Sequence, residues 1–115
     1  MADGSHSLEI APSDREAFVL CLALGTLEAM RDGSWPLEAG IWTLGRPAFW
    51  RPLVGSGGGA VKLLGAVDEL SALAKLGGRA VAEQTLDRMI AEVRSRLSAL
   101  PEKSWYARWS GETDA

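Results

Sequence analysis

The chain has only one cysteine and one histidine among its 115 residues, and these shortages exclude several kinds of chemistry. With Cys21 alone, no disulfide can form within the chain, which fits a reducing compartment. The only histidine, His6, falls in a polar N-terminal segment, so we predict no Ser-His or Cys-His catalytic pair. No Cys and His spacing typical of zinc sites is present. We therefore expect a protein that is not an enzyme and holds no cofactor or metal.

Long apolar runs and an excess of basic residues are also missing. The run from Phe18 to Leu24 is far shorter than the about 18 residues that a membrane-spanning helix needs. The first residues, MADGSHSLEIAPSD, lack the basic start of a signal peptide. The formal net charge is −3, whereas nucleic-acid-binding proteins usually carry a basic excess. We expect a cytoplasmic protein without a membrane partner, and the charge argues against nucleic acid.

Residues that favour strands are scarce, whereas residues that favour helices are abundant. Alanine and leucine together supply 33 of the 115 residues, with few isoleucines, threonines and tyrosines. A chain of this length forms one domain and can bury a core without disulfides or metals. The composition therefore predicts an all-α, single-domain helical bundle.

Apolar periodicity predicts three long helices within this bundle. In the last of them, Leu86, Ile90, Val93 and Leu97 recur at spacings of three and four, which places them on one stripe. Gly77 and Gly78 precede this helix, and Pro101 ends it. Similar stripes occur in the first helix and in a region after the glycine-rich segment. The predicted ranges are about 14–31, 60–76 and 79–100. Within the second range, Gly65 is a candidate break, with Asp68 as the cap of a second piece.

Short helical pieces are expected between the first two long helices. Ser34 is predicted to cap a short helix that has Pro36 in its first turn and Gly45 as its C-cap, although 40–44 also fits a strand. The segment RPAFWRPL, at 46–53, permits one or two helical turns between its prolines. Residues 55–59 are glycine-rich and lack the Gly-Lys-Ser/Thr ending of a phosphate loop, so we interpret them as a linker. The domain plan is a mobile segment at 1–12, a helical domain at 13–101 and a Trp-containing tail at 102–115.

Tryptophan is unusually frequent for so small a chain, with five residues against one tyrosine and two phenylalanines. Trp is enriched at binding hot spots. Trp105 and Trp109 lie four apart in the tail, and we predict that both are covered by the bundle or by a partner. Leu22, Met30 and Met89 are candidates for a second apolar stripe, which would allow self-association. Cys21 lies in the apolar first helix, where a buried and inert thiol is expected.

The region from Gly45 to Val67 contains basic residues but no acidic one. The aromatic residues Phe49 and Trp50 lie between Arg46 and Arg51, which is either a solvated surface or a contact for an acidic partner. A small ligand or nucleic acid is the alternative occupant of this segment, 46–62. The partner-binding candidates, with those of the tail, are Arg46, Phe49, Trp50, Arg51, Lys62, Trp105 and Trp109.

The layout of the chain resembles that of small bacterial all-helical proteins of the immunity or regulatory-partner kind. The resemblance covers about residues 14–100: a long helix ending in LEAMRDG, then SWPLEAGIWTL, the proline break RPAFWRPL, VDELSAL and a final long helix. It involves no diagnostic motif and transfers no functional residue. It implies a non-catalytic protein–protein interaction domain whose partner is another protein or a second copy of itself. The alternative is a small ligand- or nucleic-acid-binding helical domain.

Overall fold

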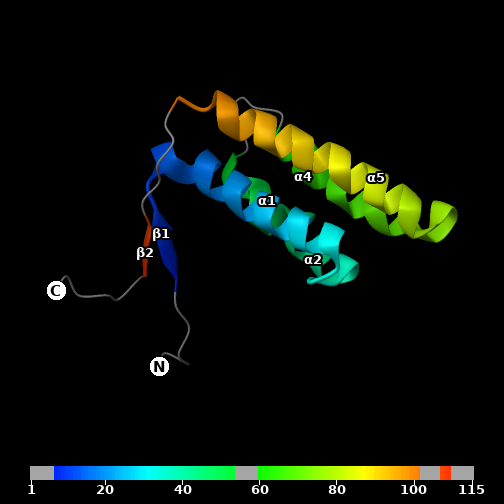
Figure 1. The fold of residues 1–115 in the computed structure, drawn as a ribbon. Helices are drawn as coiled ribbons and strands as arrows, with labels where there is room; N and C mark the ends of the chain where they lie inside the picture. Colours follow the sequence, from blue (N-terminus) through cyan, green and yellow to red (C-terminus); the bar gives the residue numbers. More distant parts are fainter. Residues whose placement is uncertain (1–6, 54–59, 102–106, 110–115) are drawn as a thin grey trace, which may run out of the picture.

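Two long helices, α1 (Arg15–Asp32) and α5 (Glu69–Ala99), pack against each other in a computed structural model that describes residues 7–53, 60–101 and 107–109 (Figure 1). The other helical elements are short and join or flank these two. They are η1 (Pro12–Asp14), α2 (Leu37–Leu44), α3 (Pro47–Trp50), η2 (Arg51–Leu53), α4 (Ala60–Gly65) and η3 (Ala66–Asp68). The result is a compact all-α fold, as the composition predicts.

The prediction of three long helices is wrong, because the region predicted at 60–76 is not one helix. It consists of α4, the 3₁₀ turn η3 and the beginning of α5. The break expected at Gly77 and Gly78 is confirmed: α5 consists of two helical arms that meet at a kink there. The backbone at Gly78 leaves helical geometry (φ 83, ψ 178), a conformation that glycine adopts without a side-chain clash. Helix α5 is thus sharply bent at Gly78.

The bend at Gly78 brings the two arms of α5 beside each other (Figure 1). Glu69, near the start of the first arm, lines the same small cleft as Arg88 and Glu92 of the second arm. The second arm also packs along α1, so α1 and both arms surround one core. Arg79, directly after the bend, donates a hydrogen bond of 2.8 Å from its guanidinium to the carbonyl oxygen of Met30. This bond ties the bend to the last turn of α1.

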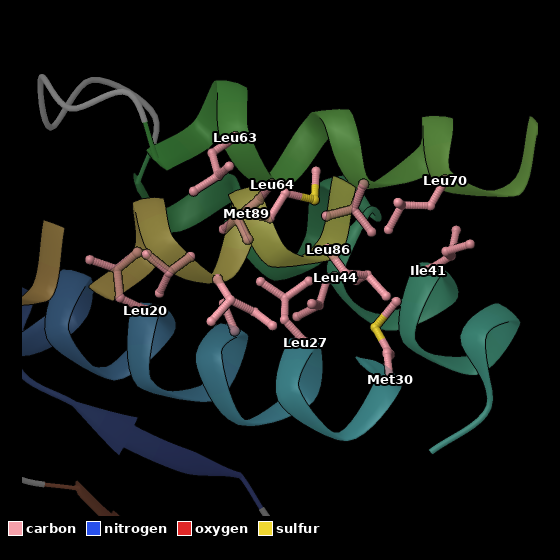
Figure 2. Packing of buried hydrophobic residues seen from close by; sticks show 14 of the residues in the cluster. Leu20, Leu27, Met30, Ile41, Leu44, Leu63, Leu64, Leu70, Leu86 and Met89 are labelled. Atoms are coloured by element: carbon pink, nitrogen blue, oxygen red, sulfur yellow. The ribbon is translucent and has the colours of Figure 1, made fainter. Parts of the chain in front are cut away.

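Apolar side chains from α1, α2, α4 and α5 form one core (Figure 2). The stripe predicted for the last helix is confirmed at Leu86, Ile90 and Val93, which are buried, whereas Leu97 is half-buried. In α1, Leu20 and Leu27 are fully buried, but Cys21 is exposed, so the prediction of a buried thiol is wrong. The largest fully buried side chains are Leu20, Leu27, Met30, Leu44, Leu64, Leu70, Leu86, Val67 and Val93.

Helix α2 forms where the sequence also fitted a strand, so the helical interpretation is confirmed. It packs against α1 with Ile41 and Leu44 buried. Gly40 makes this packing close, because a Cβ at this position would collide with the buried side chain of Met30. Helix α1 ends at Gly33, whose φ of 87 closes the helix while its N–H donates to the Ala29 carbonyl oxygen at 3.1 Å.

A short antiparallel pair of strands joins segments near the two ends of the chain. Strand β1 (Leu8–Ile10) pairs with β2 (Ala107–Trp109), with Leu8 opposite Trp109 and Ile10 opposite Ala107. The sequence analysis foresaw neither strand: β1 lies in the segment predicted to be mobile, and β2 lies in the tail. The pairing places β2 alongside β1, the strand that precedes η1 and α1 in the chain (Figure 1). Within the described ranges, no helix has the length and apolar character needed to cross a membrane.

Candidate functional site

The two aromatic residues of the predicted basic-aromatic segment contribute to the core. Phe49 and Trp50, from α3, are half-buried and pack against the buried cluster. The Nε1 of Trp50 is buried and finds no hydrogen-bond partner among the residues that the structure describes. Because these rings face the core, they do not offer an open platform for stacking against a ligand.

The three basic residues of this segment are all exposed. Arg46, Arg51 and Lys62 take part in none of the ion pairs found among the described residues. The guanidinium carbon of Arg46 lies 4.2 Å from the centroid of the Trp42 ring, which is cation–π geometry. Of the two tail candidates, Trp105 lies outside the described residues, and Trp109 lies on β2 opposite Leu8. The prediction that both indoles are covered therefore remains a prediction.

A cleft of about 410 Å³ opens beside α2, with Arg46 and Trp42 on its rim. Helix α2 supplies one wall, the connection to α3 supplies the floor, and η3 with the start of α5 supplies the opposite wall. Its lining is Ile41, Trp42, Gly45, Arg46, Pro47, Asp68 and Ser71. Gly45 lets the walls approach, because a Cβ there would collide with the Asp68 carboxylate and lie 2.9 Å from the Ile41 carbonyl oxygen.

Two exposed tryptophans lie on α2 or just before it, and one of them, Trp42, lines the cleft. Trp42 is 61% exposed and Trp35, just before α2, is 48% exposed. Both are large apolar surfaces in water, an arrangement typical of residues that become covered in a complex. We call Trp35, Trp42, Arg46 and the cleft residue Asp68 the α2 surface.

The polar groups on the α2 surface carry both signs of charge. Arg46 is positive, and the exposed carboxylate of Asp68 makes no ion pair among the described residues. At the edge, the Ser71 hydroxyl donates to the Glu38 carboxylate at 3.0 Å. An apolar centre with charges of both signs around it is suited to recognition.

A network of ion pairs holds α1 against α5 on another part of the molecule. The Arg31 guanidinium contacts Asp87 at 2.8 Å and Glu83 at 3.5 Å, and Arg79 contacts Glu83 at 3.2 Å. The hydrogen bond to Asp87 is the main reason that the pKa of Arg31 is raised. These groups are exposed and paired to one another, so we interpret them as structural contacts. Among the described residues, no three His, Cys, Asp or Glu side chains gather to hold a metal ion.

Sequence reasoning missed part of the α2 surface. The seven-residue spacing of Trp35 and Trp42, off the stripe of Leu37, Ile41 and Leu44, was the available signal for the tryptophans. Asp68 and Ser71 reach the cleft only through the packing of η3 and α5 on α2, which no local pattern encodes. Comparison of the chain with family models, curated proteins and solved structures found no match.

Proposed function

We propose that this protein is a non-catalytic protein–protein interaction domain, an immunity-type or regulatory partner protein of a bacterium, and that the α2 surface contacts its partner. The observation that carries the proposal is the 61% exposure of Trp42 at the rim of a cleft. Burying an indole against a partner removes a large apolar area from water, and such residues dominate the energy of many interfaces.

The arrangement of Arg46 strengthens this proposal. A guanidinium stacked on an indole has already lost part of its conformational freedom before binding, so less entropy is lost when it meets a carboxylate. Trp42 and Arg46 therefore form a paired anchor for a partner segment that carries an apolar side chain beside an acidic one. Asp68, across the cleft, would select for a basic group on the same segment.

A small-ligand-binding domain is the second candidate. It is supported by the cleft volume of about 410 Å³, which falls within the range of small-molecule sites, about 300–1,000 Å³. Nucleic acid is a weaker occupant, because Phe49 and Trp50, the aromatic residues between the basic side chains, pack against the core. Both candidates use Arg46, so the experiment must separate a protein partner from a small ligand.

The test begins with capture of a partner on immobilised protein, followed by measurement of its dissociation constant with purified components. We expect Trp42→Ala and Arg46→Ala each to weaken binding by at least about tenfold. Leu76→Ala is the matched control, because Leu76 is 89% exposed but lies outside the cleft. Equal losses in all three variants, or unchanged affinity in Trp42→Ala, would contradict the proposal. A purified small molecule that binds only when Trp42 is present would favour the second candidate.

A further inference from the structure

Helix α5 turns back on itself through a single residue. Its two arms, 69–77 and 79–99, are helical up to the bend. Gly78 is the one residue within α5, which the structure describes throughout, whose backbone is not helical (φ 83, ψ 178). Connections between packed helices usually take about 2–8 residues. The connection in α5 is therefore unusually short, and short hinges favour the exchange of helices between copies of a chain.

The two glycines at the bend are needed only while the helix is bent. Gly78 lies in a region of φ and ψ that is essentially restricted to glycine. At Gly77, an added Cβ would lie 2.6 Å from Cγ2 of Val81, which is too close. In a straight helix, the Cβ atoms of residues four apart are about 5–6 Å from each other, so this collision disappears. A straight α5 therefore accepts other residues at both positions.

The two arms of α5 carry side chains that would share one face if the helix were straight. In the bent chain, Glu69 of the first arm lines the same cleft as Arg88 and Glu92 of the second. Spacings of four and three link these residues through the bend, which places them on one side of a continuous helix. The face consists of Glu69, Leu73, Gly77, Val81, Thr85, Arg88 and Glu92.

We propose that two copies of the chain exchange their second arms, with both α5 helices straight and antiparallel about a twofold axis at Gly77. In this register, Leu73 of one copy lies opposite Val81 of the other. Glu69 lies opposite Thr85 and beside Arg88, its neighbours in the cleft of the bent chain. The second arm of each copy packs along α1 of the other, as it does within one chain in Figure 1. A second copy is the occupant, because it supplies the contacts that the bent chain makes with itself.

The exchanged dimer also gains a contact near the axis. Gly77 and Ala80 are exposed in the bent chain, whereas Leu73, Ala74 and Val81 are half-buried. These five residues carry no charge, and their spacings place them on one side of a straight α5. Small side chains at a helix contact allow a short distance between the helix axes. The apolar area buried there offsets part of the cost of association.

The exchange leaves the α2 surface intact and doubles it. The cleft beside α2 is lined by residues from Ile41 to Ser71, all of which precede the hinge in the chain. Each half of the dimer therefore keeps its own Trp42 and Arg46. A partner with two binding segments would bind such a dimer more tightly than the single chain. No residue of the α2 surface lies at the hinge, so the exchange does not depend on the proposed function.

This contact differs from the self-association stripe predicted from the sequence. That stripe combined Leu22 with Met30 and Met89, but both methionines are buried in the core, so the stripe is not available. Self-association through α5 needs no exposed stripe, because the exchange reuses contacts that are already buried. The core of each half is then formed by both copies.

Sedimentation equilibrium of the full chain, refolded from urea at about 10 µM to about 1 mM, tests the exchange. We expect the unmodified chain to dimerise weakly. Gly78→Ala should lower the dissociation constant of the dimer by at least about a hundredfold, because alanine disfavours the bend and favours the helix at two hinges per dimer. Gly65→Ala is the matched control and should leave the constant unchanged, since Gly65 has a φ of −63 and open space in front of it.

A lengthened hinge should have the opposite effect. Inserting Gly-Ser-Gly-Ser between Gly77 and Gly78 lets the chain turn back without a tight bend, so the dimer should be lost. A Gly78→Ala chain that stays monomeric, whether folded or unfolded by circular dichroism, would overturn the inference. A lengthened hinge that dimerises as strongly as the unmodified chain would do the same. A dimer that Trp42→Ala dissociates would also overturn it, because self-association would then use the α2 surface.

Energy transfer between labelled copies separates exchange from simple side-by-side association. Glu28 of α1 and Arg94 of the second arm form an exposed ion pair, so labels at these positions lie close together when the arm packs on α1. In a Cys21→Ser, Gly78→Ala background, chains with a donor at Glu28→Cys are refolded with chains that carry an acceptor at Arg94→Cys. Exchange predicts the transfer efficiency of a doubly labelled single chain with the unmodified hinge. Markedly weaker transfer in the mixed dimer would show association without exchange and would overturn the inference.

Discussion

Helices α1 and α5 pack on the same core, but their outward sides differ in character. The second arm of α5 turns charged residues to solvent, including Asp87, Arg88, Glu92 and Arg94. Helix α1 instead turns Cys21, Leu22 and Gly25 outward. Helix α5 is thus an ordinary surface helix with one apolar side, whereas α1 is apolar on two sides. The difference teaches that apolar content alone does not decide which side of a helix the core covers.

The contacts at the edges of the two helices do not remove this difference. Ion pairs from Arg31 to Asp87 and from Arg94 to Glu28 join the flanks of α1 and α5. Exposed pairs of this kind contribute roughly 0–1 kcal/mol each. The buried side of α1 therefore supplies most of its stabilising contacts.

The largest expected effect comes from truncating the inner side of α1. Leu27→Ala should lower the free energy of unfolding by about 2–5 kcal/mol, because Leu27 is fully buried and its removal leaves a cavity. Leu22→Ala changes an exposed residue of the same helix. It should lower the free energy of unfolding by under about 1 kcal/mol when measured at low protein concentration. Urea denaturation of both variants gives the comparison. Similar losses for the two leucines would mean that α1 is covered on both sides within one chain.

Local patterns predicted the helices well where glycine and apolar spacing act together. The range predicted for α1, 14–31, differs from Arg15–Asp32 by one residue at each end, and the stripe of Leu86, Ile90 and Val93 is buried as predicted. The exposure of Cys21 was missed because a helix that is apolar on two sides gives no signal for which side the core takes.

Tertiary packing decided what the local patterns could not. The region 60–76 was counted as one long helix, with Gly65 as a candidate break, and the chain does pass through Gly65 and the η3 turn before α5 begins. Phe49 and Trp50 were read as a surface motif, yet the turn at Pro47–Leu53 directs both toward the core. The cleft at Trp42 depends on Asp68 and Ser71, which lie far along the chain from α2. No spacing rule connects such positions.

Replacement of Gly40 by alanine should lower the stability of the fold, whereas replacement of Gly25 by alanine should raise it. Gly40 lies in α2 against α1, and a Cβ there would meet the fully buried Met30 side chain, so Gly40→Ala should destabilise the fold by about 1–3 kcal/mol. Gly25 is helical with open space in front of it. Gly25→Ala should therefore stabilise the fold by about 0.8–1 kcal/mol, the difference in helix propensity.

Thermal and urea denaturation at low protein concentration measure both glycine variants without a contribution from self-association. Met30→Ala combined with Gly40→Ala is the control for the mechanism, since the smaller side chain at position 30 removes the collision. The cost of adding the methyl group at Gly40 should then shrink. A destabilising Gly25→Ala would show that the space in front of Gly25 is already filled within the single chain.

The smallest expected effect concerns Asp32, the last residue of α1. Hydrogen bonds from the Ser34 side chain and from its backbone N–H, which lies 2.8 Å from Oδ1, lower the pKa of Asp32 below its ordinary value of 3.8. Because the folded pKa is below the unfolded one, these bonds stabilise the fold above pH 3.8, and the stabilisation is lost as pH falls through the lowered pKa. Asp32→Asn should therefore cost stability at about pH 5, and the cost should shrink toward about pH 2. Carboxyl titration by NMR measures the shift directly, and Ser34→Ala should move the pKa of Asp32 back toward 3.8. An Asp32 carboxyl that titrates at or above 3.8 in the unmodified chain would contradict this account of the helix end.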